Sequence, residues 1–325
     1  MIDKKSDIPF SRCGYSIHVL RKGDLMNSVP FEEIATITYV LTDDWYQAKG
    51  KELLKETVGQ KPVFSNSEVL TLLLLMDFLP YPGEGQYLGF IRANYLGLFP
   101  HLVDQSQFNR RARKLRMLIE HLRRHWAEEL GVTLATEFLL DTKPLPVLGY
   151  KRSKRHSDFA GSATFGYCAS RNLHYFGYKL VTLSTMSGVP IAYDLVPANT
   201  DERLAAETVL SAISHCDVFC DKGFISDEWQ TEQLVIHGNR IWTPARMNQK
   251  IQNPQGFDRW LNALRERIEG VYNEIQNTGR NLERLLRKTL LGLVTHVAAK
   301  MTSHLLKRLL RLQFGIDVQT FTQLS

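Results

Sequence analysis

The stretch TEFLLD, residues 136–141, decides how this sequence divides into domains. Its short apolar run predicts a buried strand that ends at Asp141, and Pro144 and Pro146 are expected to stop it. Residues 31–130, upstream, carry a helical pattern, whereas short apolar strands and amphipathic helices alternate downstream. The change of pattern just before TEFLLD therefore predicts a domain boundary.

Downstream of this stretch the sequence predicts several strands and then alternating helices and strands. Further strands are expected at residues 174–185, 189–197, 216–221 and 240–245, and helices at residues 200–214, 226–236 and 259–277. Three adjacent strands followed by alternating ones imply a mixed sheet with helices on both faces. This is the element order of a ribonuclease-H-like α/β domain.

Positive charge is clustered along the chain. The net charge is +6 and the pI is about 9.0, which by itself only weakly favours a polyanionic partner. Residues 101–160 hold 12 Lys/Arg against 7 Asp/Glu, and residues 278–312 hold 8 against 1. The clusters indicate localised binding surfaces rather than a uniformly basic protein.

The upstream region predicts a helical domain of helix-turn-helix type. Ser67 and Glu68 are expected to cap an apolar helix, and Asp104 to open one long basic helix through His125. The predicted organisation is a flexible leader at 1–28, in which Met26 is an alternative start, a helical DNA-binding domain at 29–132, a ribonuclease-H-like catalytic domain at 133–290 and a C-terminal helical segment at 291–325.

The composition disfavours membrane-spanning and disulfide-rich proteins. The longest apolar run, residues 70–76, is far too short to cross a bilayer, and no secretory signal is visible. The four cysteines lack the spacing of a disulfide framework or of a Cys-x-x-Cys metal site. We therefore expect a cytoplasmic protein without a membrane partner.

Three carboxylates occupy positions that the expected fold could bring together. Asp141 and Asp221 end the first and fourth predicted strands, which are neighbours in such a sheet, and Glu269 borders the apolar stripe of the last helix. Crowded carboxylates repel one another, and divalent cations that prefer oxygen ligands, Mg²⁺ or Mn²⁺, relieve this repulsion. Two such ions could activate a water or a 3′-hydroxyl for phosphoryl transfer.

Each carboxylate also has a plainer interpretation. An Asp at the end of a strand is often only a turn or cap residue, and Glu269 could form an exposed ion pair with Arg265, four residues earlier. Charge spacing alone leaves these interpretations open.

Six ordered segments between residues 135 and 290 resemble bacterial insertion-sequence DDE transposases, most closely the insertion sequence 982 family. They are LLDTKPLPV, YFGYKL, SGVPIAYDLVPANTDE, CDKGF, TPARMNQK and RERIEGVYNEI. The resemblance implies that Asp141, Asp221 and Glu269 form a catalytic triad that holds two Mg²⁺ (or Mn²⁺) ions. It also implies DNA strand cleavage and strand transfer at the terminal inverted repeats of an insertion sequence. Where the family would have a His-Asp pair after PAN, this chain has Thr200-Asp201-Glu202.

Basic residues predict the DNA-binding surfaces. The segment SQFNRRARKLR from Ser106 looks like the recognition element of a helix-turn-helix-like domain, although a solvated basic helix is the alternative. The basic loop at 151–156 follows Asp141 closely, so phosphate contacts are expected there. The candidate DNA-binding residues are Arg110, Arg111, Arg113, Lys114, Lys151, Arg152, Lys154, Arg155, Lys179, Arg246 and Arg265. Basic residues from Arg280 to Lys288 could continue this track or form a solvated face.

Two other functions remain open on the sequence alone. One is a ribonuclease-H-like nuclease that never joins strands, which the basic N-terminal helical domain disfavours. The other is a non-catalytic, domesticated DNA-binding protein, which three clustered carboxylates disfavour. The expected partners are double-stranded DNA, as terminal repeats and as target, and a second copy of the chain, because two DNA ends must be handled.

Overall fold

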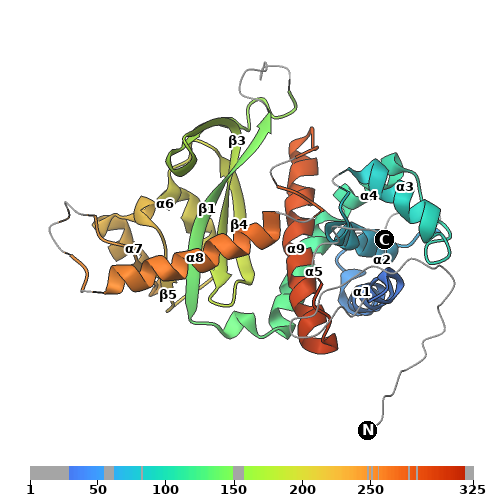
Figure 1. The fold of residues 1–325 in the computed structure, drawn as a ribbon, viewed down its shortest axis with the longest axis horizontal. Helices are drawn as coiled ribbons and strands as arrows, with labels where there is room; N and C mark the ends of the chain where they lie inside the picture. The colour runs from blue at the N-terminus through green and yellow to red at the C-terminus, as the bar shows by residue number, and fades with distance from the viewer. Residues whose placement is uncertain are drawn as a thin grey trace, which may run out of the picture.

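The computed structural model describes residues 29–54, 62–81, 83–148, 157–246, 249, 252–254, 256–276, 279–282 and 285–318. Within these ranges the side chains of residues 148, 170, 265–269 and 271 are not described. The molecule has two parts (Figure 1). One part is a β-sheet with the helices that cover it, the other is a body of helices, and the long helix α9 (Leu290–Phe314) lies between the two parts. The predicted leader, 1–28, lies outside the described residues.

The sheet is mixed, as predicted. Its strands are β1 (Glu137–Leu148), β2 (Thr164–Cys168), β3 (Leu173–Thr185), β4 (Pro190–Pro197), β5 (Asp217–Phe219) and β6 (Arg240–Trp242). β3 pairs antiparallel with β1, β2 and β4, whereas β1, β5 and β6 run parallel to one another. The strand order is β2-β3-β1-β5-β6, with β4 beside β3.

Strand β1 is longer than the sequence predicts. It continues through Pro144 and Pro146 to Leu148, so the expectation that these prolines stop it is wrong. β5 pairs only with Glu137 to Leu139. Beyond Leu139, the only described partner of β1 is β3. Proline lacks an N–H, but on the side of a strand that has no partner this removes no hydrogen bond of the sheet, so Pro144 and Pro146 can remain within β1.

The sequence does not predict β2. This short strand pairs with the first part of β3 and forms an edge of the sheet. Its aromatic residues Phe165 and Tyr167 are exposed, and Gly166 lies between them. The continuous apolar pattern that marks a buried strand is therefore missing.

Helices cover both faces of the sheet. α6 (Glu202–Leu210) and α7 (Asp227–His237) pack on one face. α8 (Phe257–Gln276) and α9 (Leu290–Phe314) pack on the other, in a core that includes Tyr178 of β3. Together with the helical region before β1, this arrangement confirms the predicted α/β fold class and is consistent with a ribonuclease-H-like sheet.

The helical body consists mainly of helices from the first part of the chain. They are α1 (Phe31–Trp45), α2 (Asn66–Leu75), α3 (Glu84–Asn94), α4 (Gln105–Lys114) and α5 (Arg116–Glu129). The expected single basic helix is interrupted at Leu115, which ends α4 and precedes α5. None of the helices in the described part of the chain combines the length and apolar character needed to cross a bilayer.

Side-chain caps fix where two of these helices begin. Ser65 caps α2 and forms a capping box with Glu68, so the cap lies two residues before the expected Ser67. Asp104 caps α4 as predicted, because its carboxylate accepts a hydrogen bond from the Gln107 N–H at 2.9 Å.

Helix α9 belongs to both parts of the molecule. Ala298, Leu305 and Leu309 lie in the core of the helical body, whereas Leu293 and Val297 lie in the core beneath α8. Figure 1 shows α9 standing between the sheet and helices α1 to α5. The last helix of the described residues therefore joins helices α1 to α5 to the sheet.

A buried polar cluster ties the segment after α8 to the helical body. Lys300 of α9 forms an ion pair with Asp77, and the Gly279 N–H donates to the Asp77 carbonyl at 3.0 Å. The Arg280 guanidinium donates to the Leu73 carbonyl at 2.7 Å, and the side chain is buried. Arg280 is therefore not available to a DNA track.

Arg287 is also engaged within the protein. Its Nη1 lies 2.5 Å from Glu84 Oε1, and both side chains are mostly buried. Lys288 is exposed, and Arg284 lies outside the described residues. For Arg280 and Arg287, both alternatives, a DNA track and a solvated face, are therefore wrong.

Candidate active site

Asp141 within β1 and Asp221 just after β5 occupy matching positions relative to the pairing of these two parallel strands. The last residues paired between β1 and β5 are Leu139 and Phe219, and each Asp follows its paired residue by two positions. In an extended chain, residues that are two positions apart have their side chains on the same face of the sheet. Leu139 and Phe219 belong to the core beneath α8, so both Asp residues lie on the face that α8 covers.

Main-chain amides orient both carboxylates. Asp221 Oδ1 accepts a hydrogen bond from the Gly223 N–H at 2.7 Å and caps the short helical turn Lys222–Phe224. Asp141 Oδ1 accepts one from the Thr142 N–H at 2.8 Å. The two acidic groups are thus held by the strand and turn that carry them.

Helix α8 crosses β1 at Asp141. The Tyr272 hydroxyl donates to the Asp141 carbonyl oxygen at 3.0 Å. Burial, and then the negative charge of Asp141, raises the pKa of Tyr272 well above its ordinary value, so the hydroxyl remains a donor. Glu269 precedes Tyr272 by three residues, which is about one helical turn on the same side. The Glu269 side chain is outside the described part of the structure.

Glu202 approaches Asp221 from the start of α6. Its Oε1 accepts a hydrogen bond from the Thr142 hydroxyl at 3.3 Å. Burial, and then the charge of Asp221, raises the pKa of Glu202, whereas the charge of Lys179 lowers it. A Cβ added to Gly223 would lie 1.8 Å from Glu202 Oε2, so the glycine permits this close approach.

Lys143, Tyr272 and Glu202 also belong to this site, although the sequence does not predict them there. Lys143 is 5% exposed, donates to Gln276 Oε1 and lies 5.6 Å from the centroid of the Tyr272 ring. Strand alternation from Asp141 would have placed Lys143 on the face beneath α8, but the neighbouring prolines hid the continuation of the strand. Glu202 could have been proposed from the sequence, because it ends the PANTDE segment, which is part of the resemblance to DDE transposases.

The oxygen donors at this edge of the sheet suit a hard divalent cation. Asp141 and Asp221 supply carboxylates, and Glu202 adds negative charge, whereas Mg²⁺ and Mn²⁺ prefer oxygen ligands. Among the side chains that the structure describes, no group of three His, Cys, Asp or Glu residues forms a metal site. A third carboxylate would therefore come from a side chain outside the described ones, and Glu269 on α8 is our candidate.

The basic residues of α4 are of two kinds. Arg110 and Lys114 are exposed. Arg111 instead donates to Asn66 Oδ1 at 2.8 Å, and Arg113 is half-buried. Arg110 and Lys114 are therefore accessible from solvent, whereas the Arg111 guanidinium joins α4 to the start of α2.

Two other basic candidates lie close to the carboxylates. Lys179 Nζ donates to the Thr200 carbonyl at 2.7 Å, and Arg246 Nη2 donates to the Lys222 carbonyl at 3.0 Å, beside the turn that holds Asp221. The candidates that lie outside the described residues are Lys151, Arg152, Lys154 and Arg155, together with the side chain of Arg265.

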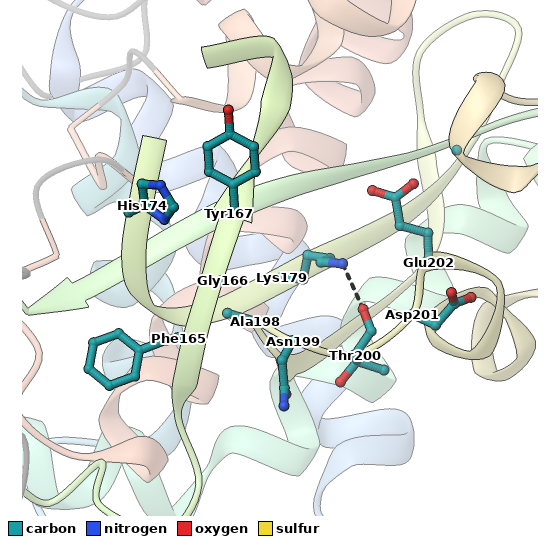
Figure 2. A pocket seen from close by; sticks show the side chains of 11 residues that line it. Phe165, Gly166, Tyr167, His174, Lys179, Ala198, Asn199, Thr200, Asp201 and Glu202 are labelled. Atoms are coloured by element: carbon teal, nitrogen blue, oxygen red, sulfur yellow. Dashed lines mark hydrogen bonds between the residues drawn. The ribbon is translucent and has the colours of Figure 1, made fainter. Parts of the chain in front are cut away.

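A groove of about 560 Å³ opens beside Glu202. Figure 2 shows Phe165, Tyr167 and His174 on one side of it and Glu202 on the other, with Lys179 between them. The groove therefore runs from the exposed aromatic rings at the sheet edge to the neighbourhood of the carboxylates.

Comparison with known proteins gives one family match. Residues 133–284 match a family model described as a transposase DDE domain. This match supports the interpretation of the chain as a transposase. No curated protein matches the chain. A solved structure, the Mos1 transposase paired-end complex with left transposon end, shares 12% identity over 70% of this chain and 85% of that chain, with a TM-score of 0.19. A score that low establishes no common architecture.

Proposed function

We propose that this chain is a DDE transposase similar to the insertion sequence 982 family. It cleaves DNA strands at the terminal inverted repeats of its element and transfers the freed ends to target DNA. The observation that carries the proposal is the register of β1 and β5, because it sets Asp141 and Asp221 side by side beneath the helix that bears Glu269. The family match over 133–284 supports the same conclusion.

In this proposal Asp141, Asp221 and Glu269 hold two Mg²⁺ (or Mn²⁺) ions. When bound, the ions stabilise charge on the attacking and leaving oxygens of the phosphodiester. The protein contributes fixed geometry: the Gly223 N–H orients Asp221, and the Tyr272 hydroxyl holds α8 against β1 at Asp141. These contacts keep the carboxylates in place before DNA arrives.

The remaining parts of the proposal concern DNA and assembly. We assign DNA binding to the helical region 29–132 and catalysis to 133–290, with 291–325 as a further helical segment. Exposed Arg110 and Lys114 would contact the DNA backbone or bases. The other basic candidates are proposed to contact phosphates near the carboxylates: Lys151, Arg152, Lys154, Arg155, Lys179, Arg246 and Arg265. A homodimer that acts on chromosomal DNA in the cytoplasm would handle both ends of the element.

The test uses a duplex that carries the terminal repeat flanking the coding sequence, with Mg²⁺, Mn²⁺ or EDTA. We expect metal-dependent nicking at the repeat end by the wild type and a decrease of roughly a hundredfold or more in Asp221→Asn, because the variant lacks a metal-binding carboxylate. Asp227→Asn, an exposed residue in the first turn of α7, is the matched control and should cleave normally.

A circular target plasmid in the same reaction separates joining from hydrolysis. Covalent attachment of the repeat end to the plasmid supports strand transfer. Cleavage without attachment would instead indicate a nuclease, and repeat binding without cleavage in any metal would indicate a non-catalytic DNA-binding protein.

A further inference from the structure

We propose that the groove beside Glu202 binds one unpaired nucleotide of the DNA substrate. Its base would stack on the aromatic rings at the edge of the sheet, and its phosphate would meet Lys179. The inference rests on the proposed function for the identity of the substrate as DNA. It adds a separate property, a preference for DNA ends that carry an unpaired nucleotide.

Exposed aromatic rings form one end of the groove. Phe165 and Tyr167 are each 53% exposed and lie on the edge strand β2. The Tyr167 ring lies 4.6 Å from the ring of His174, its paired residue on β3, at an interplanar angle of 34°. Every nucleic-acid base has a π-face that can extend such a stack, so a side-chain platform of this kind binds bases of any sequence.

The centre of the groove provides a positive charge and polar groups. Lys179 has three N–H donors, and the Thr200 carbonyl accepts one of them. The remaining donors suit a phosphate oxygen. Asn199 and Thr200 line the groove below Lys179 and add amide and hydroxyl groups able to bond a sugar or a base edge (Figure 2).

Acidic groups set the direction in which a nucleotide could lie. Asp201 is paired with Arg203 at 2.9 Å, and this contact lowers the pKa of Asp201 to about 2. Its charge is therefore largely balanced at the protein surface. Glu202 lies at the end of the groove next to Asp221, so a phosphate is favoured at Lys179 and the base at the aromatic end.

An unpaired nucleotide fits this groove better than paired DNA. In a duplex the faces of each base are covered by its neighbours, so a base reaches a lateral platform only after it leaves the stack. The volume of about 560 Å³ lies within the range of about 300–1,000 Å³ that is usual for small-ligand sites. The groove also opens toward Asp221, where the proposal places strand cleavage.

The test compares two hairpin duplexes of one sequence, one blunt and one with a single unpaired 2-aminopurine at its 3′ end. Binding to the full chain is measured by anisotropy in EDTA, and stacking by quenching of 2-aminopurine fluorescence. Stacking of one base contributes about 1–3 kcal/mol, so we expect the overhang to bind about 5- to 150-fold more tightly.

Three variants identify the platform. Tyr167→Ala should remove most of the overhang preference and of the quenching while leaving affinity for the blunt hairpin unchanged. Tyr167→Phe keeps the ring and should retain both effects. Phe314→Ala removes an exposed ring at the end of α9, away from the groove, and should behave as the wild type.

Equal binding of both hairpins by the wild type would overturn the groove proposal, and so would a preference that survives Tyr167→Ala. The terminal-repeat cleavage assay is read separately. Cleavage without an overhang preference contradicts only the groove, whereas an overhang preference without metal-dependent cleavage contradicts only the proposed catalytic function.

Discussion

Lys300 of α9 and Asp77, in the short helical turn Met76–Phe78 after α2, form an ion pair with Nζ and Oδ1 2.6 Å apart and side chains 0% and 2% exposed. Burial lowers the pKa of Lys300 to about 8, although Asp77 opposes the shift. The pair lies beside the segment that leaves α8, since the Arg280 N–H also donates to Asp77 at 3.3 Å. It therefore helps to fix the end of the helix that carries Glu269.

Breaking this pair on one side should cost much more stability than neutralising both sides. Lys300→Met removes the lysine that is paired with the buried Asp77 carboxylate, which we expect to cost about 3–5 kcal/mol in the free energy of unfolding. Asp77→Asn/Lys300→Met removes both charges while keeping an acceptor for the Arg280 N–H, so its destabilisation should be clearly smaller. Urea unfolding at neutral pH measures both, and equal destabilisation would contradict the explanation.

Gly279 should not tolerate a side chain. A Cβ there would lie 1.8 Å from the Leu79 carbonyl oxygen and 2.5 Å from that of Met76. Gly279→Ala should therefore destabilise the protein by about 1–3 kcal/mol or more and lower strand cleavage, because α8 must shift. Gly270→Ala, within α8 and with no atom of the described side chains within 4 Å of its added Cβ, is the control and should stabilise the protein by about 0.5–1 kcal/mol. Similar unfolding curves for the two variants would refute the packing argument.

Substitutions of the adjacent residues Arg110 and Arg111 should have different effects, one on DNA binding and the other on stability. Arg110→Ala should weaken binding to all DNA sequences and reduce the slope of log affinity against log salt by about 0.9 for each phosphate that Arg110 neutralises, with no change in stability. Arg111→Ala removes the bond to Asn66 and should lower the unfolding free energy by about 1.5–3 kcal/mol. Salt titrations of DNA binding and urea unfolding distinguish them; a reversed pattern would show that our assignment of exposed and structural arginines is mistaken.

His304 should make the protein less stable as the pH falls. Burial, and then the charge of Arg308, lowers the pKa of His304 from 6.5 to about 3, while its bond to the Gly188 carbonyl opposes the shift. Between these two pH values the unfolded chain binds a proton that the folded protein does not, so stability decreases toward acid. One such group contributes about 1.4 kcal/mol per pH unit.

The measurement is the unfolding free energy in urea at several pH values, from about 6 down to about 4.5, within the window in which the unfolded imidazole gains its proton. His304→Asn should show a shallower decline than the wild type, because the titrating ring is gone. Parallel declines would assign the acid sensitivity to other groups, among which His296 is buried and also has a lowered pKa.

The core strands of the sheet could be predicted from sequence because burial on both faces produces continuous apolar runs. The runs at β1, β3 and β5 predicted the order of elements along the chain, and the ribonuclease-H-like arrangement expected from that order placed the strands before Asp141 and Asp221 beside each other, as β1 and β5 are. β2 could not be found in this way, since it lies at an edge and exposes Phe165 and Tyr167. The groove was missed for the same reason.

The buried charges could not be predicted because their partners are distant in the sequence. Arg280 and Asp77 are separated by 203 positions, and Lys300 and Asp77 by 223. From local spacing, Arg280 and Arg287 resemble a solvated face, and only the tertiary fold brings Asp77 and Glu84 to them. The place of Lys143 could not be predicted either. Pro144 and Pro146 suggested that the strand ends near Asp141, whereas β1 continues through them because one of its sides has no partner strand there.

The place of α9 in the helical body has a consequence for synthesis of the protein on the ribosome. Helices α1 to α5 emerge first, yet part of their apolar core is supplied by Ala298, Leu305 and Leu309 of α9. The body cannot close until translation has passed the whole sheet region. A reading-frame shift shortly before residue 290 would therefore leave the body that carries α4 incomplete, rather than release an intact helical fragment.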